Sequence, residues 1–234
     1  MKGWPNEPDM DNDVIIAKDR AAEALGNPIS DVIFDFGNVL VFWDPAAAMM
    51  GRYSERSIDS LLDNEISGFY DANDRMDAGA SCEDTTAWLR QTKGDAWADM
   101  FAYYCENFVD SLTGVVPGAR KLIEDLKAVG IHVWGLSNWS AELFPIAWER
   151  YEILHSLEGK VVSGEIDIRK PSVEIYEYLL QRFGIEARKA VFIDDKAMNI
   201  VGANAAGIRG IRFTDPYKLR ALLIESGIDI PAVR

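Results

Sequence analysis

The chain has 234 residues, 48% of them hydrophobic and 26% charged, which is enough apolar material for a sizeable core and excludes disorder throughout. Its 24 Lys and Arg stand against 38 Asp and Glu, which gives a formal net charge of −14. We expect no binding to nucleic acid or to an anionic membrane surface, because both need clustered basic residues. The length predicts one domain, or one domain with an insertion.

The cysteines and the N-terminal residues indicate in which cellular compartment the protein is expected. Two cysteines, Cys82 and Cys105, cannot build a disulfide scaffold, so a reducing compartment is the simpler expectation. The N-terminus has no apolar run behind a basic start, and no window reaches roughly 18 uninterrupted apolar residues. The sequence therefore predicts a soluble, cytoplasmic protein with no membrane span and no evident obligate protein partner.

The first part of the chain changes from polar to apolar composition near residue 30. Residues 1–28 are polar and read as a loosely attached N-terminal extension, with a short helix-like stretch over 14–25. Residues 31–36 form an apolar run that ends at Gly37 and Asn38, which is typical of a buried strand entering a loop.

A long helical segment follows. Residues 45–113 have a helical pattern throughout, and one face carries four aromatic residues at helical spacing: Trp97, Phe101, Tyr104 and Phe108. Such a stripe most often packs in a core, and we interpret it so.

From residue 114 onward strands and helices alternate with short loops. Helices are predicted from 119 to the stop at Gly130, after Ser137-Asn138, over 176–183 up to Gly184, and around 202–206. Strands are predicted over 131–136, 190–193 and 208–213. This alternation predicts an α/β fold with a parallel sheet, interrupted after its first strand by an all-helical insertion.

Polar residues follow three of the predicted strands. The strand ends are Asp35, Ser137-Asn138 and Asp194-Asp195, and Lys170 lies in a loop between the last two. Each alone has an ordinary explanation, as a helix or turn cap or as a surface lysine. Ligands bind outside the carboxyl ends of the strands in open parallel sheets, so together these residues predict a functional site at one sheet edge.

Three of these residues suit covalent chemistry on phosphorus. Asp35 would attack an electrophilic phosphorus and form an aspartyl-phosphate, a known route for carboxylates. Ser137 would donate a hydrogen bond to a phosphoryl oxygen. Lys170 would neutralise the nucleophile and the incoming phosphate, which the net charge of −14 otherwise repels.

The acids also suit a metal. Asp194 and Asp195, with Asp35 and the carbonyl oxygen of Gly37, supply the hard oxygen ligands that Mg²⁺ prefers. Carboxylates this close to one another stay ionised only beside cations, so a divalent ion and Lys170 are both expected there.

With these residues the chain resembles the haloacid dehalogenase-like hydrolase superfamily, most closely its phosphatases with a helical cap after the first strand. The resemblance runs from about residue 31 to 213 and follows four motifs in order: residues 35–39, Ser137-Asn138, Lys170-Pro171 and Asp194-Asp195. It implies a Rossmann-like parallel sheet with strand order 5-4-1-2-3 and substrate binding by Asn38 and Asn138.

The resemblance also implies a division of the chain. Residues 29–44 and 114–234 would form the α/β core, and residues 45–113 a mobile helical cap. A cap that closes over the site excludes water and carries substrate contacts, so specificity is expected there.

One position departs from the family pattern. Most phosphatases of the family carry a second Asp two residues after the nucleophile as general acid and base, and here that position is Gly37. A bacterial subgroup related to the sugar-1-phosphatases also has Gly-Asn there, so the change does not imply a dead enzyme. Asp44 is a candidate replacement acid, but we favour the interpretation that it begins the turn at Asp44-Pro45.

The resulting hypothesis is a Mg²⁺-dependent phosphatase of a small phosphorylated metabolite, with a sugar phosphate favoured. Without an acid at Gly37, good leaving groups such as the anomeric oxygen of sugar 1-phosphates should react best. Two alternatives stay open. One is a 2-haloacid dehalogenase that uses Asp35 without metal, and the other is a binding protein that kept the fold and lost turnover.

Overall fold

The structure is a computed structural model that describes residues 14–15 and 28–232. Its central sheet contains five parallel strands in the order β8-β7-β2-β5-β6. Their bounds are β2 Asp31–Phe34, β5 His132–Ser137, β6 Gly159–Val162, β7 Ala190–Asp194 and β8 Arg209–Arg212. Counted along the chain, these strands lie in the order 5-4-1-2-3, which confirms the predicted α/β topology.

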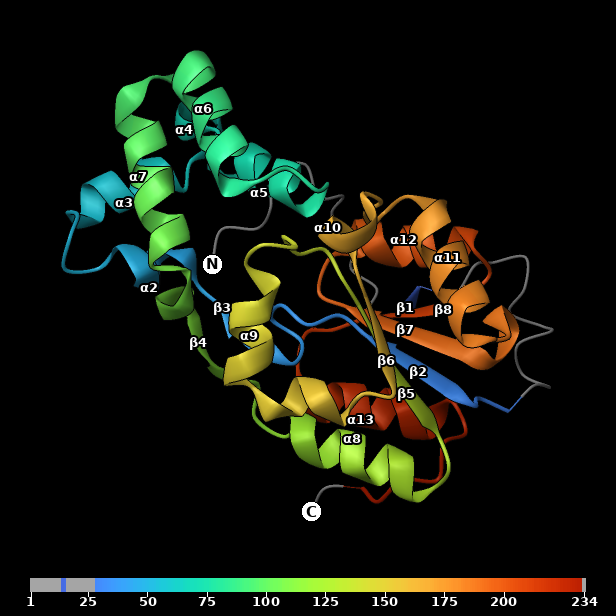
Figure 1. Cartoon of the computed structure of the whole chain (residues 1–234). Helices are drawn as coiled ribbons and strands as arrows, with labels where there is room; N and C mark the ends of the chain where they lie inside the picture. Colours follow the sequence, from blue (N-terminus) through green and yellow to red (C-terminus); the bar gives the residue numbers. More distant parts are fainter. Residues whose placement is uncertain (1–13, 16–27, 233–234) are drawn as a thin grey trace.

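Helices cover both faces of the sheet (Figure 1). Their bounds are α8 Ala119–Ala128, α9 Phe144–Arg150, α10 Ser163–Ile166, α11 Val173–Phe183, α12 Ala197–Ala205 and α13 Pro216–Glu225. Side chains alternate across β2, so Val32 and Phe34 pack with α8, α9 and α13, while Ile33 packs with α11 and α12. All four residues of β2 are therefore buried, as expected for the middle strand of a parallel sheet.

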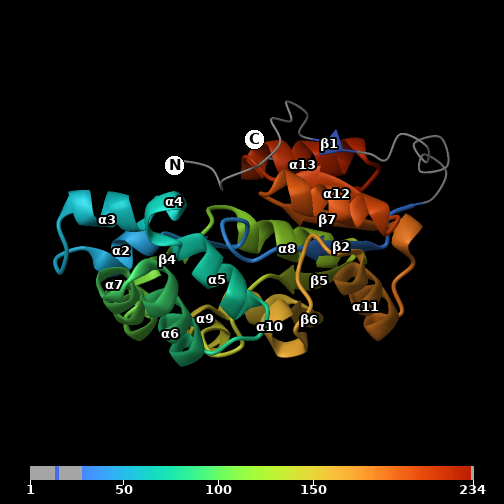
Figure 2. The ribbon, with the colours of Figure 1, turned by 90° about the horizontal axis from the view of Figure 1, so that it is seen from above.

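An all-helical insertion follows the first parallel strand (Figures 1 and 2). It contains α2 Pro45–Met49, α3 Glu55–Leu61, α4 Asn64–Ser67, α5 Phe69–Asp77, α6 Cys82–Lys93, α7 Asp95–Glu106 and the 3₁₀ helix η1 Phe108–Ser111. Two short antiparallel strands join it to the core, β3 Val41–Trp43 and β4 Leu112–Val115. The helical prediction is thus wrong for the last two residues of 45–113, which open β4, and the division into cap and core at those positions stays a prediction.

The aromatic stripe packs as predicted. Phe101, Tyr104 and Phe108 are buried, and Trp97 packs partly buried against the same cluster. Phe69 of α5 meets the rings of Phe101 and Tyr104 edge-on. These rings join α5 to α7 and form the interior of the insertion.

Strand β1 contradicts the helix predicted at its position, and the local sequence does not predict strand β6. Val14–Ile15, placed in a helix-like stretch, forms strand β1, which pairs antiparallel with β8 at the sheet edge. The rest of that stretch lies outside the described residues. The four residues of β6 carry a weak strand pattern, since they begin with Gly159 and only Val161 and Val162 are buried. Long-range pairing with β5, not local pattern, makes it a strand.

Among the described residues, the structure has no helix that is both long enough and apolar enough to span a bilayer.

Candidate active site

Lys170 lies at the centre of the candidate site and is 1% exposed. Its Nζ is 2.9 Å from Asp35 Oδ1 and 2.6 Å from Asp194 Oδ2, and it donates to the Leu136 carbonyl at 3.0 Å. Burial alone would lower the pKa of this ammonium, but the carboxylates of Asp194 and Asp35 outweigh it and hold the pKa above its usual value. The lysine is therefore charged and joins the ends of three neighbouring strands.

Asp35 follows directly on β2 and is 7% exposed. Its Oδ1 accepts hydrogen bonds from Ser137 Oγ and from the backbone N–H of Phe36, both at 2.7 Å. Ser137 is the last residue of the adjacent strand β5. The parallel pairing of β2 with β5 and β7 thus brings together residues that lie far apart in the sequence.

Asp194 is fully buried at the end of β7. Besides Lys170, it accepts from the backbone N–H of Lys196 at 2.8 Å and from Asn199 Nδ2, which is 3.0 Å from each carboxylate oxygen. Burial raises the pKa of Asp194 to about 6, while Lys170 opposes and Asp35 adds to the rise. Asn199 was missed from the sequence, although its position on the first turn of the small-residue helix after Asp194 was an available signal.

Asp195 is half-buried beside these groups. Its side chain makes no hydrogen bond or ion pair within the described part of the chain. Burial raises its pKa to about 7, and repulsion from Asp194 and Asp35 adds to the rise. Of the three acids, Asp195 is the one whose carboxylate oxygens both lack a hydrogen-bond or ion-pair partner among the described residues.

The cluster fits a magnesium ion. Oxygens of Asp35, Asp194 and Asp195 lie within 4.8 Å of one another. Three carboxylates beside one ammonium leave two negative charges, which a divalent cation with a preference for hard oxygen ligands would balance. The part predicted for the Gly37 carbonyl stays a prediction.

The two predicted substrate-binding asparagines have partners within the protein. Asn138 donates to the Lys170 carbonyl at 2.9 Å and accepts from the Lys170 N–H at 2.8 Å, which holds the loop that carries the lysine. Asn38 has a φ of 58° and accepts from the Trp43 N–H at 3.1 Å, which closes the turn before β3. Contact of either asparagine with substrate stays a prediction.

The position of the missing acid is open. A Cβ at Gly37 would have no heavy atom within 4 Å from any described residue other than its two chain neighbours. Asp44 is exposed and its Oδ1 accepts from the Ala46 N–H at 3.0 Å, which caps α2. Asp44 therefore caps a helix, whereas the sequence predicted that it begins a turn.

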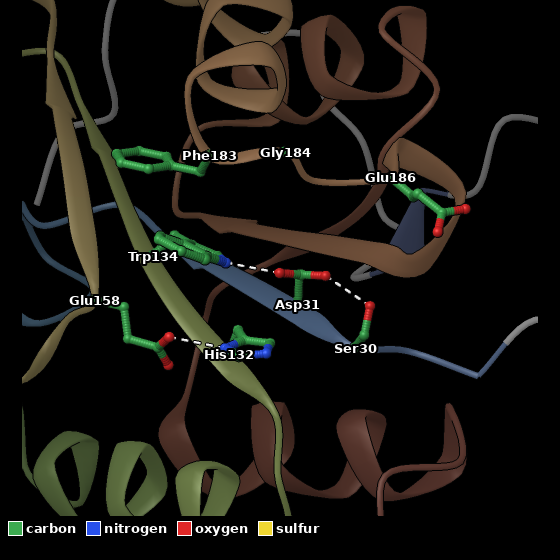
Figure 3. Close-up of a pocket in the computed structure, with 8 residues that line it drawn as sticks. All are labelled: Ser30, Asp31, His132, Trp134, Glu158, Phe183, Gly184 and Glu186. Carbon is green, nitrogen blue, oxygen red and sulfur yellow. Dashed lines mark hydrogen bonds and ion pairs between the residues drawn. The ribbon is translucent and has the colours of Figure 1, made fainter.

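A hollow of about 320 Å³ lies at the opposite edge of the sheet (Figure 3). Its residues include Asp31 and His132, which begin the strands that end beside Asp35 and Ser137. The polar groups are paired with one another, since Trp134 Nε1 donates to Asp31 at 2.8 Å and His132 Nδ1 lies 2.8 Å from Glu158. This hollow is therefore separate from the candidate active site.

The fold and the cluster of acids at the carboxyl edge of its sheet define an α/β enzyme. The family model of the haloacid dehalogenase-like hydrolases matches residues 29–207. The chain belongs to this family and is a hydrolase, which confirms the resemblance drawn from its motifs.

Known proteins similar to the chain include phosphatases. The sesquiterpene phosphatase astK of Aspergillus oryzae is 27% identical over 195 residues, which cover 78% of this chain and 89% of that protein. The drimenol cyclase drtB of Aspergillus calidoustus is 23% identical over 190 residues, but the chain spans only 33% of its length. A family enzyme of Bacteroides thetaiotaomicron, solved as a magnesium complex, superposes with a TM-score of 0.65 at 18% identity over 84% of this chain and 99% of that one. The similarity to the Bacteroides enzyme shows a shared fold and nothing more.

Proposed function

We propose that the protein is a Mg²⁺-dependent phosphatase that works through an aspartyl-phosphate on Asp35. The observation that carries this proposal is the buried ammonium of Lys170, held between Asp35 and Asp194, with the open carboxyl of Asp195 beside them. A structural ion pair needs no third, unpartnered carboxylate at a sheet edge. A site for a dianionic phosphate and a cation does.

The nucleophile is positioned by its neighbours. Oδ1 of Asp35 accepts from Ser137 and Phe36 and contacts Lys170, which leaves Oδ2 to attack phosphorus. The bond from phosphorus to the leaving oxygen breaks as the new bond to Asp35 forms. Water then attacks the same phosphorus, which releases inorganic phosphate and restores the carboxylate.

Asp35, Asp194 and Asp195 would hold the ion, with the Gly37 carbonyl as a further ligand. When bound, Mg²⁺ supplies positive charge that offsets the charge of the phosphoryl group. The chain's own residues keep the nucleophile ionised and oriented, and Asn138 keeps Lys170 in place through the loop backbone.

The substrate is proposed as a small phosphorylated metabolite. The helical insertion, taken as a cap over residues 45–113, would choose it. Gly37 and the motif resemblance favour a sugar phosphate, whereas the similarity to the sesquiterpene phosphatase astK adds a phosphorylated sesquiterpene to the candidates. A panel of sugar, prenyl, aryl and glycerol phosphates separates these classes.

Substitution of the nucleophile tests the proposal. Asp35→Asn is nearly isosteric but cannot attack phosphorus, so phosphate release from p-nitrophenyl phosphate should fall by several orders of magnitude. Acid-quenched wild type should carry one phosphoryl group on the peptide that contains Asp35, and the variant none. Circular dichroism of the variant should match that of wild type.

Other outcomes identify the alternatives. Retention of more than about a tenth of the activity in Asp35→Asn would exclude Asp35 as the nucleophile. Halide release from a 2-haloacid in excess chelator would instead support the dehalogenase. An absence of turnover across the panel, with and without Mg²⁺, would support a binding protein.

A further inference from the structure

Gly37 leaves the proposed phosphatase without its usual general acid, and few described groups near the site can replace it. Asp44 caps α2 and is exposed. Asp74 is ion-paired with Arg169 at 2.8 Å. The hydroxyl of Tyr104 bonds with Trp43, and burial raises its pKa well above its usual value, so it does not titrate near neutral pH.

Asp77 is the last residue of α5, which lies beside α10 in both ribbon views (Figures 1 and 2). Its carbonyl accepts from Ser163 Oγ at 2.6 Å, and Ser163 Oγ in turn accepts from the Trp139 N–H at 3.1 Å. Trp139 stands two residues after Ser137, the partner of the nucleophile. One serine thus ties the backbone of Asp77 to the strand end that forms the site.

A second contact holds the same helix to the other side of the site. Arg169 donates to the carbonyl and to the carboxylate of Asp74, both at 2.8 Å. Arg169 immediately precedes Lys170, whose ammonium contacts Asp35. The C-terminal turn of α5 is therefore fixed against two of the loops that build the site.

The carboxyl of Asp77 has no such partner. It makes no hydrogen bond or ion pair with any residue that the structure describes, although it is half-buried. Burial raises its pKa to about 7, Lys196, Arg169 and Lys170 oppose the rise, and Asp74 adds to it. Tyr104 of α7 also lies within electrostatic range. Its neighbours thus include the site lysine, and at neutral pH a large fraction of the group carries a proton.

We propose that Asp77 is the general acid and base of the reaction, supplied by the helical insertion in place of the acid missing at Gly37. The proposal rests on the phosphatase function proposed above. As Asp35 attacks, the leaving oxygen receives the electron pair of the broken P–O bond and the proton of Asp77. The Asp77 carboxylate then takes a proton from the water that attacks the phosphoenzyme, and phosphate leaves as the P–Oδ bond breaks.

An acid in the insertion has a consequence for substrate range. It would act only when this helix stands over the site, so protonation and exclusion of water would occur together. Alkyl and prenyl phosphates, whose leaving oxygens are basic, then become substrates. With Asp77 as the acid, we no longer expect a preference for good leaving groups. The logarithm of kcat/KM should instead change little as the basicity of the leaving oxygen rises.

The test compares Asp77→Asn with wild type on a series of phosphates of rising leaving-group basicity. The quantity plotted is kcat/KM, which reports phosphoryl transfer to Asp35 and not the later hydrolysis. Loss in the variant should be less than about threefold for 2,4-dinitrophenyl phosphate and about 10²–10⁴-fold for an alkyl phosphate. Wild-type activity on the alkyl phosphate should fall above pH 7, where Asp77 is ionised. The pH profile of Asp77→Asn should lack this fall.

A rescue and a control sharpen the test. Gly37→Asp in the Asp77→Asn background should restore alkyl phosphate turnover, because the space beside Gly37 accepts a side chain. Asp59→Asn, an exposed change on α3 of the same insertion, should match wild type on every substrate.

Two results overturn the proposal for Asp77. One is an equal loss on aryl and alkyl phosphates in Asp77→Asn, which would indicate a merely structural contribution. The other is an alkyl phosphate rate that equals wild type. Failure of the phosphatase function is recognised separately, since wild type itself would then release no phosphate from any member of the series.

Discussion

At the residue scale, the site depends on one buried lysine. Lys170 has two carboxylate partners within 3 Å, and neither it nor Asp194 has access to solvent. Removal of one partner from a buried ion pair leaves an uncompensated charge, which typically costs about 3–5 kcal/mol. The same three charges would then govern both the stability of the apoprotein and the reaction.

Substitution of the lysine should therefore affect binding and chemistry together. Lys170→Ala removes positive charge beside Asp35 and beside the incoming phosphoryl oxygens, so KM should rise and kcat should fall, each by at least about tenfold. Lys170→Arg should rescue poorly, because a planar guanidinium does not replace a compact ammonium in a closed space. Steady-state kinetics with p-nitrophenyl phosphate measures both parameters, and wild-type values in Lys170→Ala would remove the lysine from the site.

The two adjacent acids should behave differently. Asp195→Asn removes an open ligand, so the Mg²⁺ concentration for half-maximal activity should rise more than it does in Asp194→Asn. Without metal, Asp194→Asn should lower the free energy of unfolding by about 3–5 kcal/mol, because Lys170 loses its nearest partner. Asp195→Asn should leave that stability unchanged or higher, since it removes repulsion. Magnesium titrations measure the metal requirement of the two variants, and denaturant unfolding measures their stability. If Asp194→Asn raised the Mg²⁺ requirement more and Asp195→Asn lowered the stability more, the roles assigned to the two acids would be exchanged.

At the element scale, α12 packs closely against the loop that carries Lys170. A Cβ at Gly202 would lie 2.3 Å from the Pro171 carbonyl oxygen and 2.9 Å from the ring of Tyr176. The Tyr176 hydroxyl donates to the Asn199 carbonyl at 2.6 Å, which ties α11 to the same helix. Glycine permits this approach, and the approach places Asn199 and Lys170 around Asp194.

Gly202→Ala tests this packing. Alanine is the better helix former by about 1 kcal/mol, yet we expect a net loss of stability of about 1–3 kcal/mol, because the contact is with backbone that cannot move aside cheaply. Activity should fall as the Lys170 loop shifts. Val201→Ala, at an exposed position on the same helix, is the control and should change neither. Greater thermal stability in Gly202→Ala would show that the loop moves aside at little cost.

At the scale of the whole molecule, the net charge of −14 opposes the proposed substrate. Attraction must come from groups inside the site, which bulk salt screens far less than it screens the distant acids. The acidic surface repels phosphate, whereas Lys170 and the proposed Mg²⁺ attract it, and the salt dependence of the rate separates these two effects.

We therefore expect kcat/KM for a phosphate dianion to rise, by up to about tenfold, between low salt and about 0.15 M potassium chloride, where the screening length is roughly 8 Å. A sugar bisphosphate should respond more strongly than a monophosphate. Rates measured at fixed free Mg²⁺ check this. A fall in kcat/KM over the same salt range would mean that the cations of the site attract the substrate from outside the site and outweigh the repulsion by the acidic surface.

The sequence by itself determined the parallel α/β core, the helical character of the insertion and the order of the four motifs. These follow from local signals: apolar runs such as residues 31–36, helical periodicity in the aromatic stripe, and polar residues where strands end. Such signals are read from a few adjacent residues, so no tertiary information was needed.

Only the tertiary structure decided which groups meet. Asp74 and Arg169 are 95 positions apart in the chain, and no local pattern indicates that they bind or that Asp77 lies within electrostatic range of Lys170. The strand character of β1 and β6 likewise depends on hydrogen bonds to distant partners. Side-chain type reports what a residue can do, whereas distance and burial, which decide whether it does so, are set by packing of the whole chain.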